Sequence, residues 1–192
     1  MKLRFAIVAT LLSVVGLGAC RDPLELEARI ETTIDTLSVF AISGTPPGYP
    51  NALTITGRQT LPISAFGGFD VAFDIDDSNR AVVHAARRVI STGGFVPTVG
   101  LQIVPGTFET VMAAPLTGYK VDSSVVVSEG QVVVLEAQHN GTGDLCTFAI
   151  SPNVYAKISI DTVFAATRTI KFRLGTDLNC GFRSFAPGIP TS

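Results

Sequence analysis

The stretch "VYAKISIDTVFAATRTIKFRL", residues 154–174, alternates apolar and polar side chains on both sides of a short break. The apolar positions are Val154, Ala156, Ile158 and Ile160 before the break and Ile170, Phe172 and Leu174 after it. A period of two is the spacing of a strand with one buried face. Residues 164–168 supply the turn, so the stretch predicts an antiparallel hairpin. Asp161 is placed to pair with Lys171 or Arg173 across its outer face.

A second alternating stretch, "GFDVAFDIDD" at 68–77, predicts a strand with one wet face. Phe69, Val71, Phe73 and Ile75 occupy one face, and Asp70, Ala72, Asp74 and Asp76 occupy the other. Residues 77–80, "DSNR", favour a turn because Asp, Ser and Asn bond their own backbone. Residues 81–91 then fit a returning strand better than a helix.

Two further regions read as strands. The valine runs 125–127 and 132–135, joined at Glu129-Gly130, predict a second hairpin buried on both faces. Residues 24–35, "LELEARIETTID", alternate strictly and favour a strand, although Asp22-Pro23 offers a helix start as the alternative.

Gly/Pro-rich stretches at 43–52, 91–100 and 140–144 separate these segments and predict surface loops. Short strands between such loops indicate an all-β domain, an antiparallel β-sandwich or a barrel-like fold. Pattern alone leaves the choice between sandwich and barrel open.

The chain begins with Lys2 and Arg4, followed by an uncharged apolar run over 5–17. This order is typical of an export signal, and the run is too short to span a bilayer, which needs about 20 residues. It ends in Leu17-Gly18-Ala19-Cys20, which resembles the lipobox of bacterial lipoproteins. The expected organisation is a signal peptide over 1–19, a lipidated tether over 20–23 and one β-domain over 24–192.

The resemblance implies that Cys20 receives a diacylglycerol and becomes the first residue of a lipid-anchored cell-envelope protein. Two or more acyl chains hold a protein stably on a membrane. In Gram-negative lipoproteins an aspartate after that cysteine often signals inner-membrane retention. Arg21 stands there instead, which favours the outer membrane, facing the periplasm or the cell surface.

Charge excludes one class of partner. Of the 14 Lys and Arg, two precede Cys20, which leaves 12 against 16 Asp and Glu, a formal charge of −4. Nucleic-acid binding needs clustered Lys and Arg, and no basic block occurs.

With Cys20 acylated, Cys146 and Cys180 remain, and an exported chain favours a disulfide between them. Such a bridge adds about 3–4 kcal/mol through the entropy of the unfolded chain. Cys146 is in phase with Phe148 and Ile150, which predicts that it faces the core. Two buried free thiols are the alternative.

Chemistry-bearing motifs are scarce. Asp74, Asp76 and Ser78 have the spacing of the first three ligands of a calcium loop, but Ala85 stands where its bidentate glutamate belongs. A solvated turn is therefore favoured over a metal site, and no cofactor is expected. His84 and His139 are the only histidines, and no catalytic motif accompanies them.

Five aromatic residues lie in or near the loops and could line a ligand or partner surface: Phe66, Phe69, Phe95, Phe108 and Tyr119. The favoured alternative is that they close the ends of the core.

Three functions follow as hypotheses. The first is a non-catalytic binding or structural module at the membrane surface, with an envelope protein as a candidate partner. The second is a calycin-like barrel that carries a small apolar ligand. The third is a hydrolase with a scattered active site, which would need a serine or carboxylate beside His84 or His139 in a cleft.

Overall fold

The computed structural model describes residues 27–65, 68–90, 96–139 and 141–191. Its strands are β1 (Thr33–Phe40), β2 (Ala52–Thr54), β3 (Gln59–Leu61), β4 (Val71–Ile75), β5 (Ala81–Ala85), β6 (Val99–Val104), β7 (Lys120–Val121), β8 (Ser124–Val127), β9 (Val132–Gln138), β10 (Asn153–Phe164) and β11 (Thr169–Asp177). The helical turns are α2 (Ala86–Val89) and η2 (Ala165–Thr167). In the part of the chain that the structure describes, no helix has the length and apolar character needed to cross a membrane.

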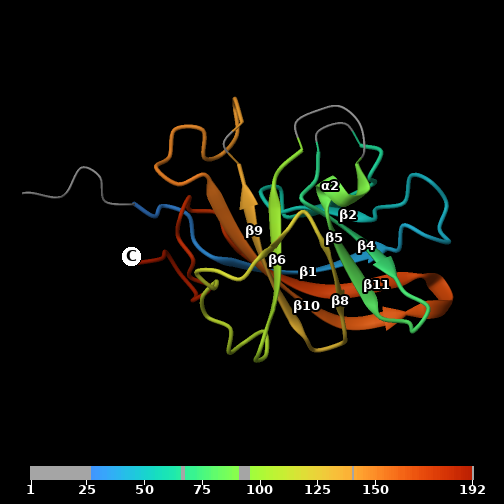
Figure 1. Cartoon of the computed structure of the whole chain (residues 1–192). Helices are drawn as coiled ribbons and strands as arrows, with labels where there is room; N and C mark the ends of the chain where they lie inside the picture. Colours follow the sequence, from blue (N-terminus) through green and yellow to red (C-terminus); the bar gives the residue numbers. More distant parts are fainter. Residues whose placement is uncertain (1–26, 66–67, 91–95, 140, 192) are drawn as a thin grey trace, which may run out of the picture.

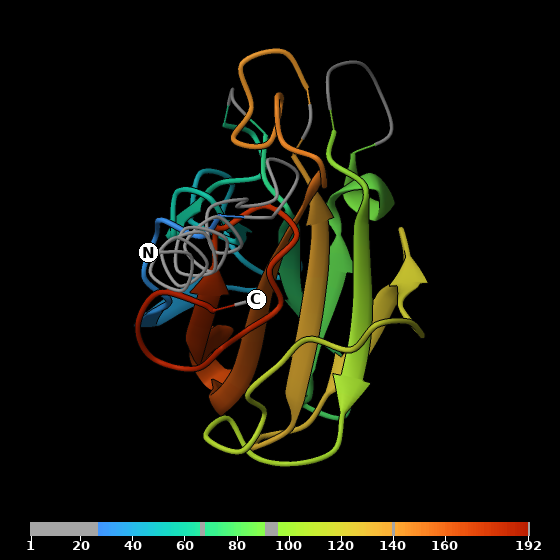
Figure 2. The ribbon, with the colours of Figure 1, turned by 90° about the vertical axis from the view of Figure 1, so that its left-hand side faces the viewer.

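The strands form two antiparallel sheets that pack face to face (Figures 1 and 2). One has the order β1-β11-β10-β9-β6-β7, and the other has the order β3-β2-β4-β5-β8. Phe73 of β4 stacks on Phe172 of β11 with ring centroids 4.9 Å apart. The predicted β-sandwich is confirmed, and the closed barrel is excluded because the strands divide into two separate sheets.

The β10–β11 hairpin is confirmed. Phe164 pairs with Thr169 at its end, and Arg168 closes the turn in the left-handed region at φ 54°. The Arg173 Nε donates to Asp161 Oδ1 at 3.0 Å, as the cross-strand pattern predicts.

The outer face of this hairpin is not open to solvent along β10, because a second layer covers Tyr155, Lys157 and Ser159. The Lys157 ammonium donates to the carbonyls of Phe108 and Val111, at 2.5 and 2.8 Å. It also lies over the rings of Phe108 and Phe185. Burial lowers the pKa of Lys157. This lysine therefore fixes the long β6–β7 connection and the C-terminal segment onto the six-stranded sheet.

The predicted second hairpin is wrong. β8 pairs with β5 in the five-stranded sheet, whereas β9 pairs with β6 and β10 in the other. The turn at Glu129-Gly130 therefore carries the chain from one sheet to the other. Burial on both faces holds for β9, but Val126 of β8 is 38% exposed because β8 lies at a sheet edge.

The predicted strand over 24–35 is also wrong in extent. β1 begins at Thr33, residues 27–31 form neither strand nor helix, and residues 24–26 of the predicted strand lie outside the described residues. The reason is a change of partner: the Asn179 side chain accepts the backbone N–H groups of Arg29 and Ile30, at 2.7 and 2.9 Å. These two N–H groups are therefore not free for a sheet ladder.

The prediction that Ala72 lies on a solvent-exposed face of β4 is wrong, because Ala72 is fully buried. Ala72 packs in a small apolar cluster with Ala52, Phe69 and Ala86 on the outer side of the five-stranded sheet. The turn after β4 is confirmed, with Asn79 at φ 58°. The returning strand is confirmed as far as Ala85, where α2 takes over.

Candidate functional site

A buried carboxylate–imidazole pair joins the two sheets at one end of the sandwich. Asp70 lies directly before β4, and His139 lies directly after β9. His139 Nε2 is 2.9 Å from Asp70 Oδ1, and the Asp70 residue is 1% exposed. The other carboxylate oxygen accepts the backbone N–H of Ile55 at 2.6 Å. Asp144 Oδ1 approaches His139 Nδ1 at 3.6 Å.

Two opposing effects act on His139. Burial lowers its pKa, while the hydrogen bond with Asp70 and the charges of Asp70 and Asp144 raise it. The net pKa is raised, so the pair favours the imidazolium form. The pair is therefore a charged link between β4 and the loop that follows β9.

A pocket of about 80 Å³ opens beside this pair. It is lined by Thr54, Thr56, Gly68, Phe69, Asp70, Pro97, His139 and Asp144. That volume holds a few water molecules and is well below the roughly 300 Å³ of small-molecule sites. None of these described lining residues is serine, cysteine or lysine. The pocket thus has a carboxylate beside His139, and its hydroxyl groups are those of Thr54 and Thr56, which lie 3.3 Å from each other.

The second histidine forms a cross-strand pair on an open sheet surface. His84 Nδ1 lies 2.7 Å from the Ser124 hydroxyl, and the two residues are direct partners in the β5–β8 register. Burial lowers the pKa of His84, the charge of Asp74 raises it and that of Arg88 lowers it, with a net lowering. No other described residue bonds its second ring nitrogen, so the third group that orients the base in a hydrolase is not found among the described residues.

The loop that begins at His139 is held in place from several sides. Its Cys146 forms a disulfide with Cys180, which confirms the predicted bridge. Cys146 N donates to the His139 carbonyl, and His139 N donates to the Pro152 carbonyl, each at 2.8 Å. The Thr147 hydroxyl donates to the carbonyls of Gly141 and Asp144, at 2.6 and 2.7 Å.

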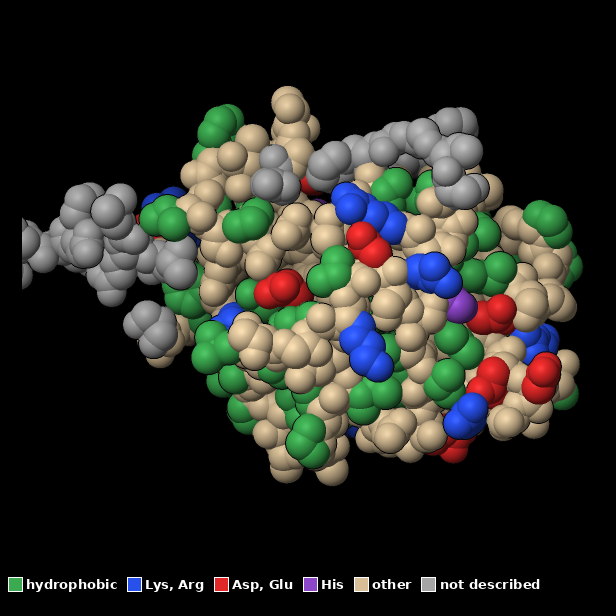
Figure 3. Space-filling view, viewed as in Figure 1, with side chains coloured by type: hydrophobic (Ala, Val, Ile, Leu, Met, Phe, Trp, Pro, Cys, Tyr) green, Lys and Arg blue, Asp and Glu red, His purple; other side chains and the backbone are tan. Residues whose placement is uncertain are grey.

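The tip of this loop is apolar and exposed. Phe148 is 100% exposed, Ile150 67% and Leu145 45%. Cys146 faces the core as predicted, but Phe148 and Ile150 do not share its phase, because residues 141–150 form successive turns rather than a strand. Hydrophobic side chains accordingly project over this loop at the upper left of Figure 3. We refer to residues 141–151 as the apolar loop.

The N-terminal segment enters the fold beside the base of this loop. Asn179, which holds the backbone of Arg29 and Ile30, is the neighbour of Cys180. Its own amide donates to Asp177 Oδ1 at 2.8 Å. Figure 1 places the first described residues, the C-terminal segment and the loop after β9 on its left-hand side, and the register agrees, since the start of β1 and the end of β11 lie beside the start of β10.

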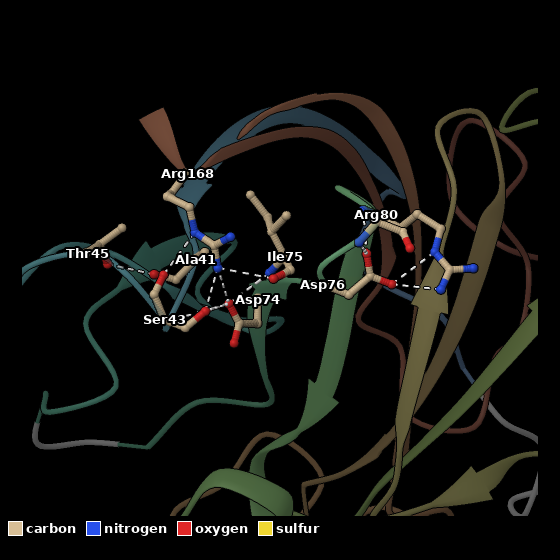
Figure 4. A network of polar contacts seen from close by, with 9 residues as sticks. Ala41, Ser43, Thr45, Asp74, Ile75, Asp76, Arg80 and Arg168 are labelled. Atoms are coloured by element: carbon tan, nitrogen blue, oxygen red, sulfur yellow. Dashed lines mark hydrogen bonds and ion pairs between the residues drawn. The ribbon is translucent and has the colours of Figure 1, made fainter. Parts of the chain in front are cut away.

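Asp74 and Asp76, the carboxylates of the candidate calcium loop, form ion pairs with arginines (Figure 4). Asp74 Oδ1 accepts from Arg168 Nη2 at 3.0 Å and from the Ser43 hydroxyl at 2.6 Å. Asp76 binds Arg80 through both of its oxygens. Ser78 lies between them in the turn, where its N–H donates to Asp76. Among the described residues, no three His, Cys, Asp or Glu side chains gather as a metal-binding group.

Three of the five candidate aromatic residues are described, and of these Phe69 lines the pocket beside His139. Phe69 and Phe108 are buried, and the half-buried Tyr119 donates its hydroxyl to the Pro115 carbonyl at 3.0 Å. Phe66 and Phe95 lie outside the described residues, as does Cys20 with the whole lipobox.

Sequence reasoning missed two parts of the site. The alternation of residues predicts a wet face for Asp70, and it predicts one core-facing side for Cys146, Phe148 and Ile150. Residues 140–144, "NGTGD", are predicted as a loop, and the turns of the structure continue beyond them to residue 150.

Fold and site together define an all-β, two-sheet sandwich with a disulfide-pinned apolar loop. No protein-family model, curated protein or solved structure matches the chain.

Proposed function

We propose that this chain is a lipid-anchored cell-envelope protein that acts as a non-catalytic binding module through its apolar loop. The observation that carries the proposal is the complete exposure of Phe148 on a loop pinned by a disulfide and by backbone hydrogen bonds at its base. Isolated exposed apolar side chains are ordinary, whereas contiguous exposed apolar patches mark interaction sites, and this loop carries Leu145, Phe148 and Ile150 together within six residues.

The envelope location is supported by two features. The leader ending at Cys20 is the first, and the disulfide is the second, because structural disulfides persist mainly in oxidising compartments. Anchoring through Cys20, with the outer membrane favoured by Arg21, is part of the proposal.

The two rival functions have less support. A calycin-like carrier needs a closed barrel around a ligand cavity, whereas side chains such as Phe73 and Phe172 fill the space between these sheets. The Asp70 carboxylate beside His139 meets one requirement of a hydrolase, but the Thr54 and Thr56 hydroxyls that line the pocket bond each other and have no described bond to His139. In the His84–Ser124 pair, no described residue bonds the second ring nitrogen of His84.

The anchor is tested with the full precursor carrying Cys20→Ala. We expect loss of acyl labelling and accumulation of the uncleaved precursor. The matched control is the double variant Cys146→Ala, Cys180→Ala, which removes the other two thiols and should still be labelled at Cys20. Continued labelling and cleavage of the Cys20→Ala chain would refute the anchor.

A further inference from the structure

We infer that the apolar loop enters the interface of the bilayer that carries the anchor, so that the domain contacts the membrane at two points. This inference rests on the proposed function, and it names the partner of the same loop: a phospholipid surface.

The first argument is the position of the tether. Arg29 and Ile30 are bound by Asn179, whose neighbour Cys180 is covalently linked to Cys146 of the apolar loop. The point where the chain arrives from Cys20 and the base of the loop are therefore parts of one cross-linked structure.

The second argument is the length of chain that is available. Cys20 and Glu27 are seven residues apart. A chain of that length spans at most about 25 Å when fully extended. The end of the sandwich that bears the loop is thus held close to the acylated cysteine and hence to the lipid.

The third argument is the chemistry of the loop. Residues 141–151 contain no Lys or Arg, and their one acidic side chain, Asp144, faces His139 and the N–H of Gly141. Ile30 and Ile189 add exposed apolar side chains near the tether, where Thr32 pairs with Gly188. A mature chain with a net charge of −4 gains nothing from anionic headgroups, so apolar insertion is the interaction that remains.

The opposite end of the sandwich differs in character. It carries Asp74, Asp76, Arg80 and Arg168, and Figure 3 shows acidic and basic side chains together on its right-hand side. Charged groups lose hydration at a bilayer, so this end is suited to face water.

The test uses the absence of tryptophan from the chain. Phe148→Trp places a single fluorophore at the loop tip. Phe164→Trp is the matched control, since Phe164 is also exposed, at 49%, and is the last residue of β10, next to the β10–β11 turn at the other end. Each full-length precursor is expressed, processed and reconstituted into phosphatidylcholine vesicles with plain or brominated acyl chains.

On reconstitution, we expect the indole emission of the Phe148→Trp chain to lie to the blue of its emission without vesicles, and to be weaker in brominated than in plain lipid. We expect the emission of the Phe164→Trp chain to be the same in all three samples. Adding Leu145→Ser and Ile150→Ser to the Phe148→Trp chain should reduce the quenching, because burial of the loop then removes less apolar surface from water. Intact disulfide in each variant shows that the loop is still pinned.

Equal quenching of the two variants would overturn the inference. A blue shift of the Phe148→Trp chain without quenching would also overturn it, because the loop would then be covered by protein, such as a second copy of the chain. Acylation of Cys20 is measured by mass on the same samples. The absence of acylation refutes the anchor. The contact of the loop with lipid is decided separately, by comparing the quenching by brominated lipid of the Phe148→Trp and Phe164→Trp chains.

Discussion

Removal of the His139 imidazole should destabilise the domain far more than removal of the chain's other histidine. His139→Ala leaves the Asp70 carboxylate, which is 1% exposed, without its charged partner. Removing one partner of a buried ion pair typically costs about 3–5 kcal/mol. Asp70 keeps the N–H of Ile55, and the adjoining pocket admits water, so we expect the lower end, about 3 kcal/mol.

His84→Ala is the matched control. Among the described residues, His84 has one hydrogen-bond partner, the exposed Ser124 on the sheet surface. We expect its loss to cost about 0.5–1 kcal/mol. Equilibrium urea unfolding of both variants and the parent chain gives the two free energies of unfolding directly. Equal losses, or a loss below about 1 kcal/mol for His139→Ala, would refute a buried charged pair at this position.

The pKa values of the two histidines should lie on opposite sides of 6.5, the ordinary pKa of a histidine. The pKa of His139 is raised, so its contribution to stability is complete below pH 6.5 and is lost as the pH rises through the higher folded-state pKa. The pKa of His84 is lowered, so folding opposes its protonation and stability falls as the pH drops below 6.5. A proton NMR titration of the imidazole ring resonances, assigned with the two alanine variants, measures the pKa of each histidine. A His139 pKa at or below that of His84 would contradict the assignment of charge to the Asp70 pair.

Two other perturbations probe the frame around the site. Replacing both Cys146 and Cys180 by alanine should lower the free energy of unfolding by about 3–4 kcal/mol and raise amide hydrogen exchange over 141–151, and unchanged exchange there would show that the disulfide does not hold the loop. Arg168→Ala removes donors to Ser43, Asp74 and the Ile75 carbonyl (Figure 4) and should cost about 1–3 kcal/mol by thermal or urea unfolding. Arg80→Ala, which removes the exposed partner of Asp76, should change stability little, and a larger loss for Arg80 than for Arg168 would reverse our ranking of the two networks.

Local patterns in the sequence predicted the elements that depend on neighbours along the chain. Period-two alternation located β4, β10 and β11, and "DSNR" located the turn with Asn79 in the left-handed region. The pairing of Cys146 with Cys180 followed from counting thiols once Cys20 was set aside.

Features that depend on distant packing were not predictable in this way. A Glu129-Gly130 turn looks the same whether the next strand folds back or crosses to the other sheet, and here it crosses. Asp70 shares the alternation of Asp74, yet it is buried because the segment after β9 brings His139 onto it. Phe148 is exposed because the Thr147 hydroxyl binds two nearby carbonyls and favours turns over a strand.

The pairing of β1 with β11 also determines when the domain can become complete. Thr33 faces Thr176, a separation of 143 residues, and β11 lies between β1 and β10 in the six-stranded sheet. A chain that emerges from its N-terminus, during synthesis or passage across a membrane, carries β1 without its partner strand until nearly all of it is through. Local hairpins can form during that time, but the large sheet closes only after the last strand arrives. The strand order therefore delays completion of the six-stranded sheet until emergence is almost finished, whereas all strands of the five-stranded sheet precede residue 128.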